Sequence, residues 1–164
     1  YYSKYLGLIP IFVLLQVLVL NEILFFTYIN PYLYLALIIS LPLKASKWFL
    51  LIYAFGIGFL IDLFGGSLGF HSTATVFIAF IKPAISKITI PYSILEDTDE
   101  ITLNKIGSKS FIVFSLLMIL IHSIILFGLE HLHFNFHILG KIIASSLVTL
   151  VLVLILEIFK SSKK

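Results

Sequence analysis

The sequence predicts an all-α integral membrane protein, in which six transmembrane helices form one compact bundle over residues 1–164. Hydropathy is the first reason: 60% of the residues are hydrophobic and the mean hydropathy is +1.15, whereas soluble domains are about 45–50% apolar. The second reason is that cutting the sequence at its charged residues leaves six apolar stretches, at residues 5–21, 23–43, 48–61, 63–81, 110–129 and 142–156. Most of them approach the roughly 20 residues that a helix needs to cross a hydrocarbon core.

The third observation, the placement of the basic residues, predicts the orientation. All 11 are Lys, and only Lys141 falls on the outer side if both termini are cytoplasmic. The other lysines lie inside or at the inner ends of spans, as the positive-inside rule requires: Lys4, Lys44, Lys47, Lys82, Lys87, Lys105, Lys109, Lys160, Lys163 and Lys164. Because they are spread over inner loops and the tail, they are expected to meet the anionic lipid bilayer and not a nucleic acid.

The expected spans cover residues 5–20, 31–43, 48–64, 70–85, 110–129 and 138–159, and a cytoplasmic loop covers residues 86–109. Pro31 suits the first turn of the second span, and Asn30 before it is a candidate N-cap. Tyr28, Tyr32 and Tyr34 cluster near the expected outer interface, where aromatic side chains commonly form a belt. A belt role is therefore expected for all three tyrosines.

Small and polar residues recur every four positions in the third and fourth spans. Such spacing puts side chains on one helix face, and small residues let helices approach closely in lipid. The two stripes expected to hold the bundle together are Ala54, Gly58 and Asp62 in one span and His71, Thr75 and Ala79 in the next. Gly65, Gly66 and Gly69 predict a tight outer turn between these spans, because glycine adopts the positive φ that such turns require.

Asp62 is the most informative single residue, since a carboxylate inside an apolar span is costly. It lies close to the glycine turn, so the main expectation is that it locks this turn. It would accept hydrogen bonds from the N–H groups of Gly65, Gly66 or Ser67, and it would pair with His71. Ion or proton coupling and contact with a partner subunit remain alternatives.

Two other polar clusters attract functional interpretations. The acidic residues Glu96, Asp97, Asp99 and Glu100 form either a solvated loop face or a cytoplasmic docking patch for a basic partner. His131, His133 and His137 resemble metal ligands, but no helix is firmly predicted there, and the spacing alone is a weak signal. We therefore expect no metal and no cofactor.

Catalytic patterns are missing from the sequence, which contains no paired carboxylates within one span, nucleophile elbow, Walker-type loop or zinc-protease helix. An enzyme is therefore not expected.

Part of the sequence resembles the rod shape-determining protein MreD family, in its Bacteroidetes branch. The resemblance lies in residues 28–83: the run Asn30-Pro31-Tyr32-Leu33-Tyr34, the continuous segment 56–71, which carries Gly58, Asp62, Gly65, Gly69 and His71, and the small-residue segment 73–80. The family pattern is an Asn-Pro start to the second span, a G-x-x-x-D helix end, a glycine-rich turn and a Leu-Gly pair.

The resemblance implies a fold similar to the substrate-binding components of energy-coupling-factor transporters, in the bacterial inner membrane. It also implies a non-enzymatic scaffold in the cell-elongation, peptidoglycan-synthesising complex. The direct partner would be MreC, a single-span protein, which connects to a class B penicillin-binding protein, RodA and MreB. The alternative is the substrate-binding subunit of a small-molecule, vitamin-type transporter.

Overall fold

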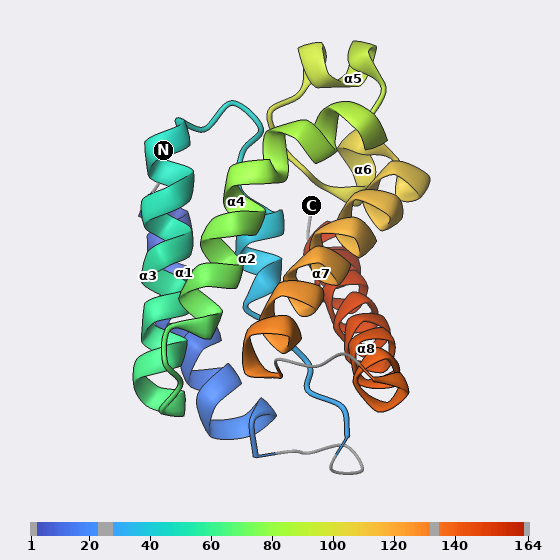
Figure 1. The fold of residues 1–164 in the computed structure, drawn as a ribbon. Coiled ribbons are helices and arrows are strands. Elements are labelled where there is room, and N and C mark those ends of the chain that lie inside the picture. Colours follow the sequence, from blue (N-terminus) through green and yellow to red (C-terminus); the bar gives the residue numbers. More distant parts are fainter. Residues whose placement is uncertain (1–2, 23–27, 132–134, 163–164) are drawn as a thin grey trace.

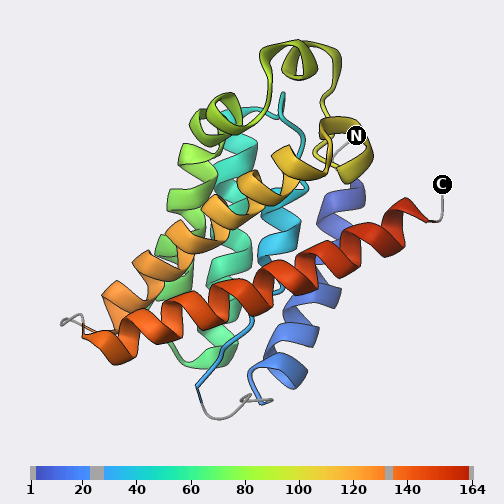
Figure 2. The same cartoon turned by 90° about the vertical axis from the view of Figure 1, so that its right-hand side faces the viewer.

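The computed structural model describes residues 3–22, 28–131 and 135–162, and every regular element in these ranges is helical. Long helices pack side by side around a short central one, and both ends of the chain lie in the upper half of the molecule (Figures 1 and 2). The elements in order are α1 (Ser3–Leu15), the π-helix η1 (Gln16–Leu20), α2 (Leu35–Ile39), α3 (Lys47–Gly65), α4 (Phe70–Thr89), α5 (Tyr92–Asp97), α6 (Leu103–Ile106), α7 (Ser108–Glu130) and α8 (Phe136–Ser161).

In the part of the chain that the structure describes, four helices are long and apolar enough to cross a membrane: the continuous Ser3–Leu20 segment, α3, α7 and α8. The all-helical class is thus confirmed, and the composition of these helices is that of a membrane protein. α4 has 20 residues, similar to α3, but it is not among the four. Its buried face carries polar residues, among them Ser72, Thr75, Lys82 and Ser86.

The predicted second span is wrong as a single helix. Residues 28–34 form irregular backbone, and of the described residues between η1 and α3 only the five of α2 are α-helical. Tyr34 precedes the first residue of α2, so Asn30 is not an N-cap and Pro31 is not the first helical residue. We call residues 28–34 the extended segment. It needs no helix hydrogen bonds because side chains of other helices satisfy its backbone, as described below.

The α3–α4 hairpin follows from local sequence. Ser46 caps the start of α3 by accepting a hydrogen bond from Phe49 N (3.2 Å). Gly66 ends α3 with φ of 69°, and Gly69 precedes α4 with φ of 86°. Both values lie in the left-handed region, which only glycine adopts without strain.

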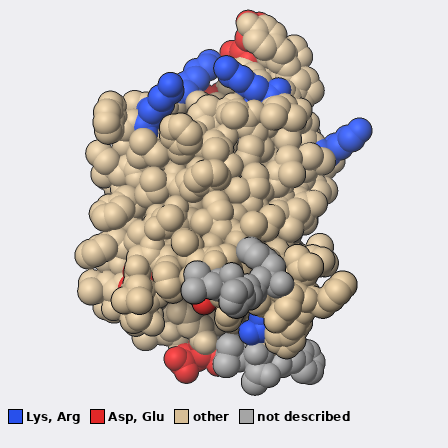
Figure 3. Space-filling model, viewed as in Figure 1, with Lys and Arg blue, Asp and Glu red and all other residues tan. Residues whose placement is uncertain are grey.

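The core lies around α2, all of whose residues are buried. α2 runs through the middle of the bundle, with α4 and α7 on one side and α8 crossing obliquely (Figures 1 and 2). The outer faces of the long helices are apolar and exposed. In Figure 3 Lys side chains gather along the upper rim, above a broad band without charge. Such a band is what a hydrocarbon layer requires.

Candidate functional site

The extended segment is held by side chains from both ends of the sequence. Asn30 N donates to Ser145 Oγ (3.1 Å), and Tyr32 N donates to Thr149 Oγ1 (3.0 Å), both on α8. From η1, Gln16 accepts from Leu33 N at Oε1 (2.9 Å) and donates from Nε2 to the Pro31 carbonyl (2.8 Å). These bonds explain how non-helical backbone is tolerated inside an apolar bundle, where each unpaired N–H or C=O is costly.

The extended segment and α2 with the two residues after it (residues 28–41) form what we call the central segment. Lys82 of α4 binds the end of this segment that lies opposite residues 28–34. Its ammonium donates to the carbonyls of Ile38 (2.9 Å), Ile39 (3.3 Å) and Leu41 (2.6 Å). An ammonium has three N–H groups, so all three are used. The side chain is 1% exposed. Lys82 is therefore a buried cap for the end of α2. The expectation that it meets the lipid headgroups is wrong, because its ammonium lies inside the bundle.

Tyr34, His71 and His122 form a polar cluster beside the start of α2. The Tyr34 hydroxyl lies 2.9 Å from His71 Nδ1 and 3.0 Å from His122 Nε2. It has a single proton, so it donates to one imidazole and accepts from the other. Tyr34 and His122 are fully buried, and Tyr32 packs edge-on nearby. The predicted belt role is thus wrong for Tyr32 and Tyr34.

His122 keeps one unpaired nitrogen within this cluster. Nδ1 has no hydrogen-bond partner among the described residues, and neither does the hydroxyl of Ser115 on the same helix. Whichever tautomer His122 adopts, its Nδ1 is a fully buried donor or acceptor without a partner among the described residues. Such groups are uncommon in folded proteins and mark strain or function.

Asp62 joins the end of α3 to the start of α4. Its carboxylate accepts from the N–H groups of His71 (3.0 Å) and Ser72 (2.8 Å), and from the hydroxyls of Ser67 and Ser72. It therefore caps the first turn of α4 from another helix. The expected donors Gly65 and Gly66 are not the ones used, and His71 contacts Asp62 through its backbone and not its imidazole.

The two predicted stripes face each other across the α3–α4 contact. The Thr75 hydroxyl donates to the Ala54 carbonyl (2.9 Å). A Cβ on Gly58 would lie 2.5 Å from Ser72 Cα and 2.4 Å from Thr75 Oγ1. No real Cβ is found so close to backbone, so the close approach of these helices depends on the missing side chain at Gly58.

The acidic residues of the loop make several contacts within the chain. Asp99 accepts from the backbone N–H of Lys44 through its side chain, and from Leu43 N (2.8 Å) through its carbonyl. Glu100 lies 4.0 Å from Lys4, whereas Glu96 and Asp97 are exposed at the end of α5. A docking patch would therefore centre on Glu96 and Asp97.

The two described histidines around the start of α8, His131 and His137, lie in different surroundings. His131 stacks on Phe127, and His137 packs edge-on against Tyr28, whose hydroxyl donates to the His137 carbonyl (2.7 Å). His133 lies outside the described residues. Within the described ranges, no group of three His, Cys, Asp or Glu residues is arranged to hold a metal ion.

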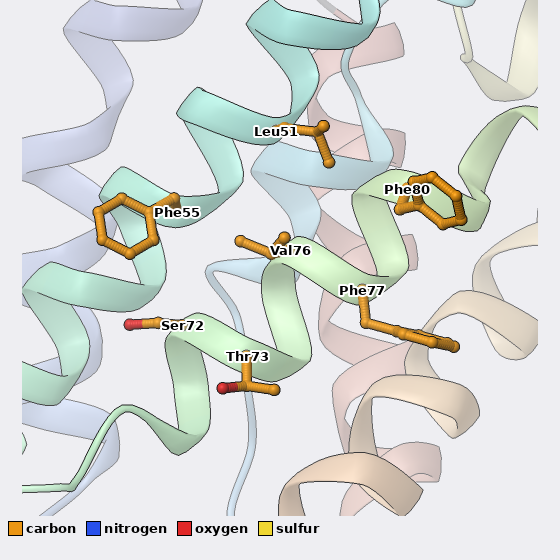
Figure 4. A pocket seen from close by; sticks show the side chains of 7 residues that line it. All are labelled: Leu51, Phe55, Ser72, Thr73, Val76, Phe77 and Phe80. Carbon is orange, nitrogen blue, oxygen red and sulfur yellow. The ribbon is translucent and has the colours of Figure 1, made fainter.

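An apolar groove of about 510 Å³ runs along the outer side of α3 and α4. In Figure 4 Val76 forms its floor, with Leu51 and Phe55 of α3 on one side and Phe77 and Phe80 on the other. We call this the α3–α4 groove. It carries no charged residue and is concave along two adjacent helices, which suits the side of a third helix.

Two other hollows lie nearer the lysine-rich end. One, of about 400 Å³, is lined by α1, α2 and α8. Both lysines of its lining lie near a carboxylate, Lys4 near Glu100 (4.0 Å) and Lys160 near Glu157 (3.5 Å). The other, of about 550 Å³, lies between α4 and α7.

The sequence prediction missed the residues that support the central segment: Gln16, Lys82, His122, Ser145 and Thr149. One signal was available for three of them. Gln16, Lys82 and His122 are strongly polar residues within apolar stretches, and such residues usually face the bundle interior and bind a partner there. Ser145 and Thr149 give no such signal, since serine and threonine are common in membrane helices.

Comparison with known proteins adds no family to this chain, because no family model, curated protein or solved structure matches it.

Proposed function

We propose that this chain is a non-enzymatic membrane scaffold of the MreD type, which binds an MreC-like single-span protein and helps to position it with the cell-wall synthases. The observation that carries the proposal is the α3–α4 groove. It is an uncharged concave strip on the outside of a bundle whose own helices are already packed. Its lining includes the small or medium side chains Ser72, Thr73 and Val76. In lipid, helices associate through such close packing.

The burial of the polar groups also supports a scaffold. Asp62, Thr75 and Lys82 are buried and hydrogen-bonded to neighbouring backbone. Their bonds fix the relative positions of α2, α3 and α4, and so give the groove a defined shape. A rigid outer surface is what a scaffold presents to a partner helix.

A groove-filling substitution tests the docking face. Val76→Trp should fill the groove and reduce co-purification of a co-expressed MreC-like protein, whereas Val151→Trp on the exposed face of α8 should leave it unchanged. A photo-crosslinking amino acid at Phe77 should capture the partner, and one at Ile155 should not. Equal recovery with both tryptophan variants, or capture from Ile155 alone, would contradict the proposed face.

The proposal includes six crossings with both termini in the cytoplasm of a bacterial inner membrane. For this, α4 and the broken central segment must also traverse the bilayer in addition to the four apolar helices. The chain has no cysteine, so single cysteines report the side of the membrane directly. A membrane-impermeant maleimide should label Leu68→Cys in intact cells, and Asp97→Cys and Ser162→Cys only after permeabilisation. Labelling of the latter two in intact cells would contradict this orientation.

The second candidate function is the binding subunit of a small-molecule transporter, and the broken central segment favours it. Transporters often bind substrate where a helix is interrupted within the membrane. Here the interruption lies beside Tyr34 and the unpaired Nδ1 of His122. Native mass spectrometry separates the candidates: a co-purifying vitamin-sized molecule would favour transport, and a co-purifying single-span protein would favour the scaffold.

A further inference from the structure

The hollow between α4 and α7 combines positive charge with an apolar wall. Its volume is about 550 Å³, and its lining includes Lys87, Ile88 and Tyr92 on one side and Lys109, Val113 and Leu117 on the other. The residues that line it belong mainly to the last turns of α4 and the first turns of α7, and Figure 1 shows these turns at the upper end of the molecule, below α5. We call it the α4–α7 cavity.

The two lysines of the α4–α7 cavity have no counter-charge. No Asp or Glu is among its described lining residues, and within the described ranges neither Lys87 nor Lys109 has an ion pair or a side-chain hydrogen bond. The lysines that line the hollow between α1, α2 and α8 differ, since Lys4 and Lys160 each lie near a carboxylate. The α4–α7 cavity is thus a concave site with an unneutralised positive charge.

The first turn of α7 adds to this charge. No side chain caps the helix, and the first N–H that bonds within it is that of Phe111, to the Gly107 carbonyl. The N–H groups of residues 108–110 are therefore free of helix partners, as at any helix start. Together with Lys109 they favour an anion at this end of the helix.

The apolar wall of the α4–α7 cavity leads away from the charges along α7. Lys109, Val113 and Leu117 are four residues apart, so they form one stripe on the helix. The stripe descends about 12 Å from the lysine towards the uncharged band. Ile88 and Tyr92 are largely exposed on the other side. A ligand that fits both parts has an anionic head and a hydrocarbon tail.

We propose that the α4–α7 cavity binds the phosphate head group of an anionic membrane lipid. The phosphate lies between Lys87 and Lys109 at the start of α7, and one acyl chain follows Val113 and Leu117. A free phosphate ion would use the lysines but not the apolar stripe. The site is separate from the α3–α4 groove, so it does not depend on the proposed partner.

The experiment uses the full chain in detergent micelles containing equal amounts of phosphatidylglycerol and phosphatidylcholine, with bound lipid counted by native mass spectrometry. The double variant Lys87→Gln/Lys109→Gln is compared with Lys47→Gln/Lys105→Gln, which removes the same charge from exposed lysines outside the cavity. Loss of two headgroup contacts should lower phosphatidylglycerol binding by about tenfold or more in the first variant. The second variant should bind like the original chain, and all three should unfold at similar temperatures.

Three results would overturn the proposal. Equal loss in both double variants would mean general attraction to a positive surface. Phosphatidylcholine bound as well as phosphatidylglycerol would mean that the charge is not recognised. Displacement of the lipid by inorganic phosphate at the same concentration would mean that the apolar stripe contributes nothing.

Discussion

The ammonium of Lys82 donates a 2.6 Å hydrogen bond to the backbone carbonyl of Leu41, on a segment 41 residues earlier in the chain. Two further carbonyls at the end of α2 use its remaining protons. A charged residue of α4 thereby terminates a five-residue helix that is too short to be stable alone.

Replacement of Lys82 should therefore destabilise the protein. Lys82→Met keeps the aliphatic stem but removes the donor of the Ile39 and Leu41 carbonyls, while Ile38 still accepts from Leu41 N. We expect a loss of about 2–4 kcal/mol in the free energy of unfolding. Unfolding by denaturing detergent, followed by circular dichroism, measures the loss. Lys87→Met is the matched control, because Lys87 is exposed on the same helix and should change stability by no more than about 0.5 kcal/mol. Equal effects would mean that the cap is unimportant.

The contact between α3 and α4 predicts opposite outcomes for two glycines of α3. Gly58→Ala places a Cβ against Ser72 backbone and should cost about 1–3 kcal/mol through overpacking. Gly56→Ala meets nothing within 4 Å and should stabilise the helix by about 0.5–1 kcal/mol. Melting temperatures of the two variants in one detergent decide this, and a neutral Gly58→Ala would show that the helices separate without strain.

The cluster of Tyr34, His71 and His122 predicts that loss of the Tyr34 hydroxyl group destabilises the protein. Tyr34→Phe removes the atom that both His71 and His122 contact, and should cost about 1–3 kcal/mol because buried imidazole nitrogens lose their partner. The ¹⁵N resonances of both histidine rings should shift as well. Tyr92→Phe, at an exposed tyrosine, should change neither measurement. Unchanged histidine resonances in Tyr34→Phe would contradict the cluster.

The carboxylate of Asp62 should stabilise the start of α4. Asp62→Ala removes the acceptor for two N–H groups and two hydroxyls, so a loss of about 2–3 kcal/mol is expected from the cap and its unpaired donors. Asp62→Asn should lose less, since one carbonyl oxygen remains. Hydrogen exchange at the amides of His71 and Ser72 measures the fraying directly. Asp97→Ala, at an exposed position, is the control and should leave exchange at these two amides unchanged. If Asp62→Ala also left their exchange unchanged, the proposed role of Asp62 would be contradicted.

Local signals in the sequence predicted the hairpin well. Gly66 and Gly69 mark the turn, and the four-residue spacing of Ala54, Gly58 and Asp62 identifies the face that packs on α4. These features are predictable because each depends on residues only a few positions apart. The long apolar stretches that form α7 and α8 are also visible in the local sequence, and they predicted the all-helical class correctly.

The central segment was not predictable in the same way. Hydropathy indicates that residues 31–43 are buried but not whether their backbone is helical. That choice depends on Ser145 and Thr149, which lie 115 and 117 residues further along the chain from their partners. The predicted belt role of Tyr34 was wrong for a similar reason. The two histidines that its hydroxyl contacts come from α4 and α7, and nothing near Tyr34 in the sequence identifies them.

The dependence of the extended segment on α8 has a consequence for biosynthesis. When the ribosome has made residues 28–34, the hydroxyls that will accept hydrogen bonds from Asn30 N and Tyr32 N do not yet exist. Among apolar side chains these N–H groups find no substitute acceptor, so the segment reaches its final structure only after α8 has been made. A chain that terminates before α8 would keep these two N–H groups unpaired, and it could not complete the core around α2.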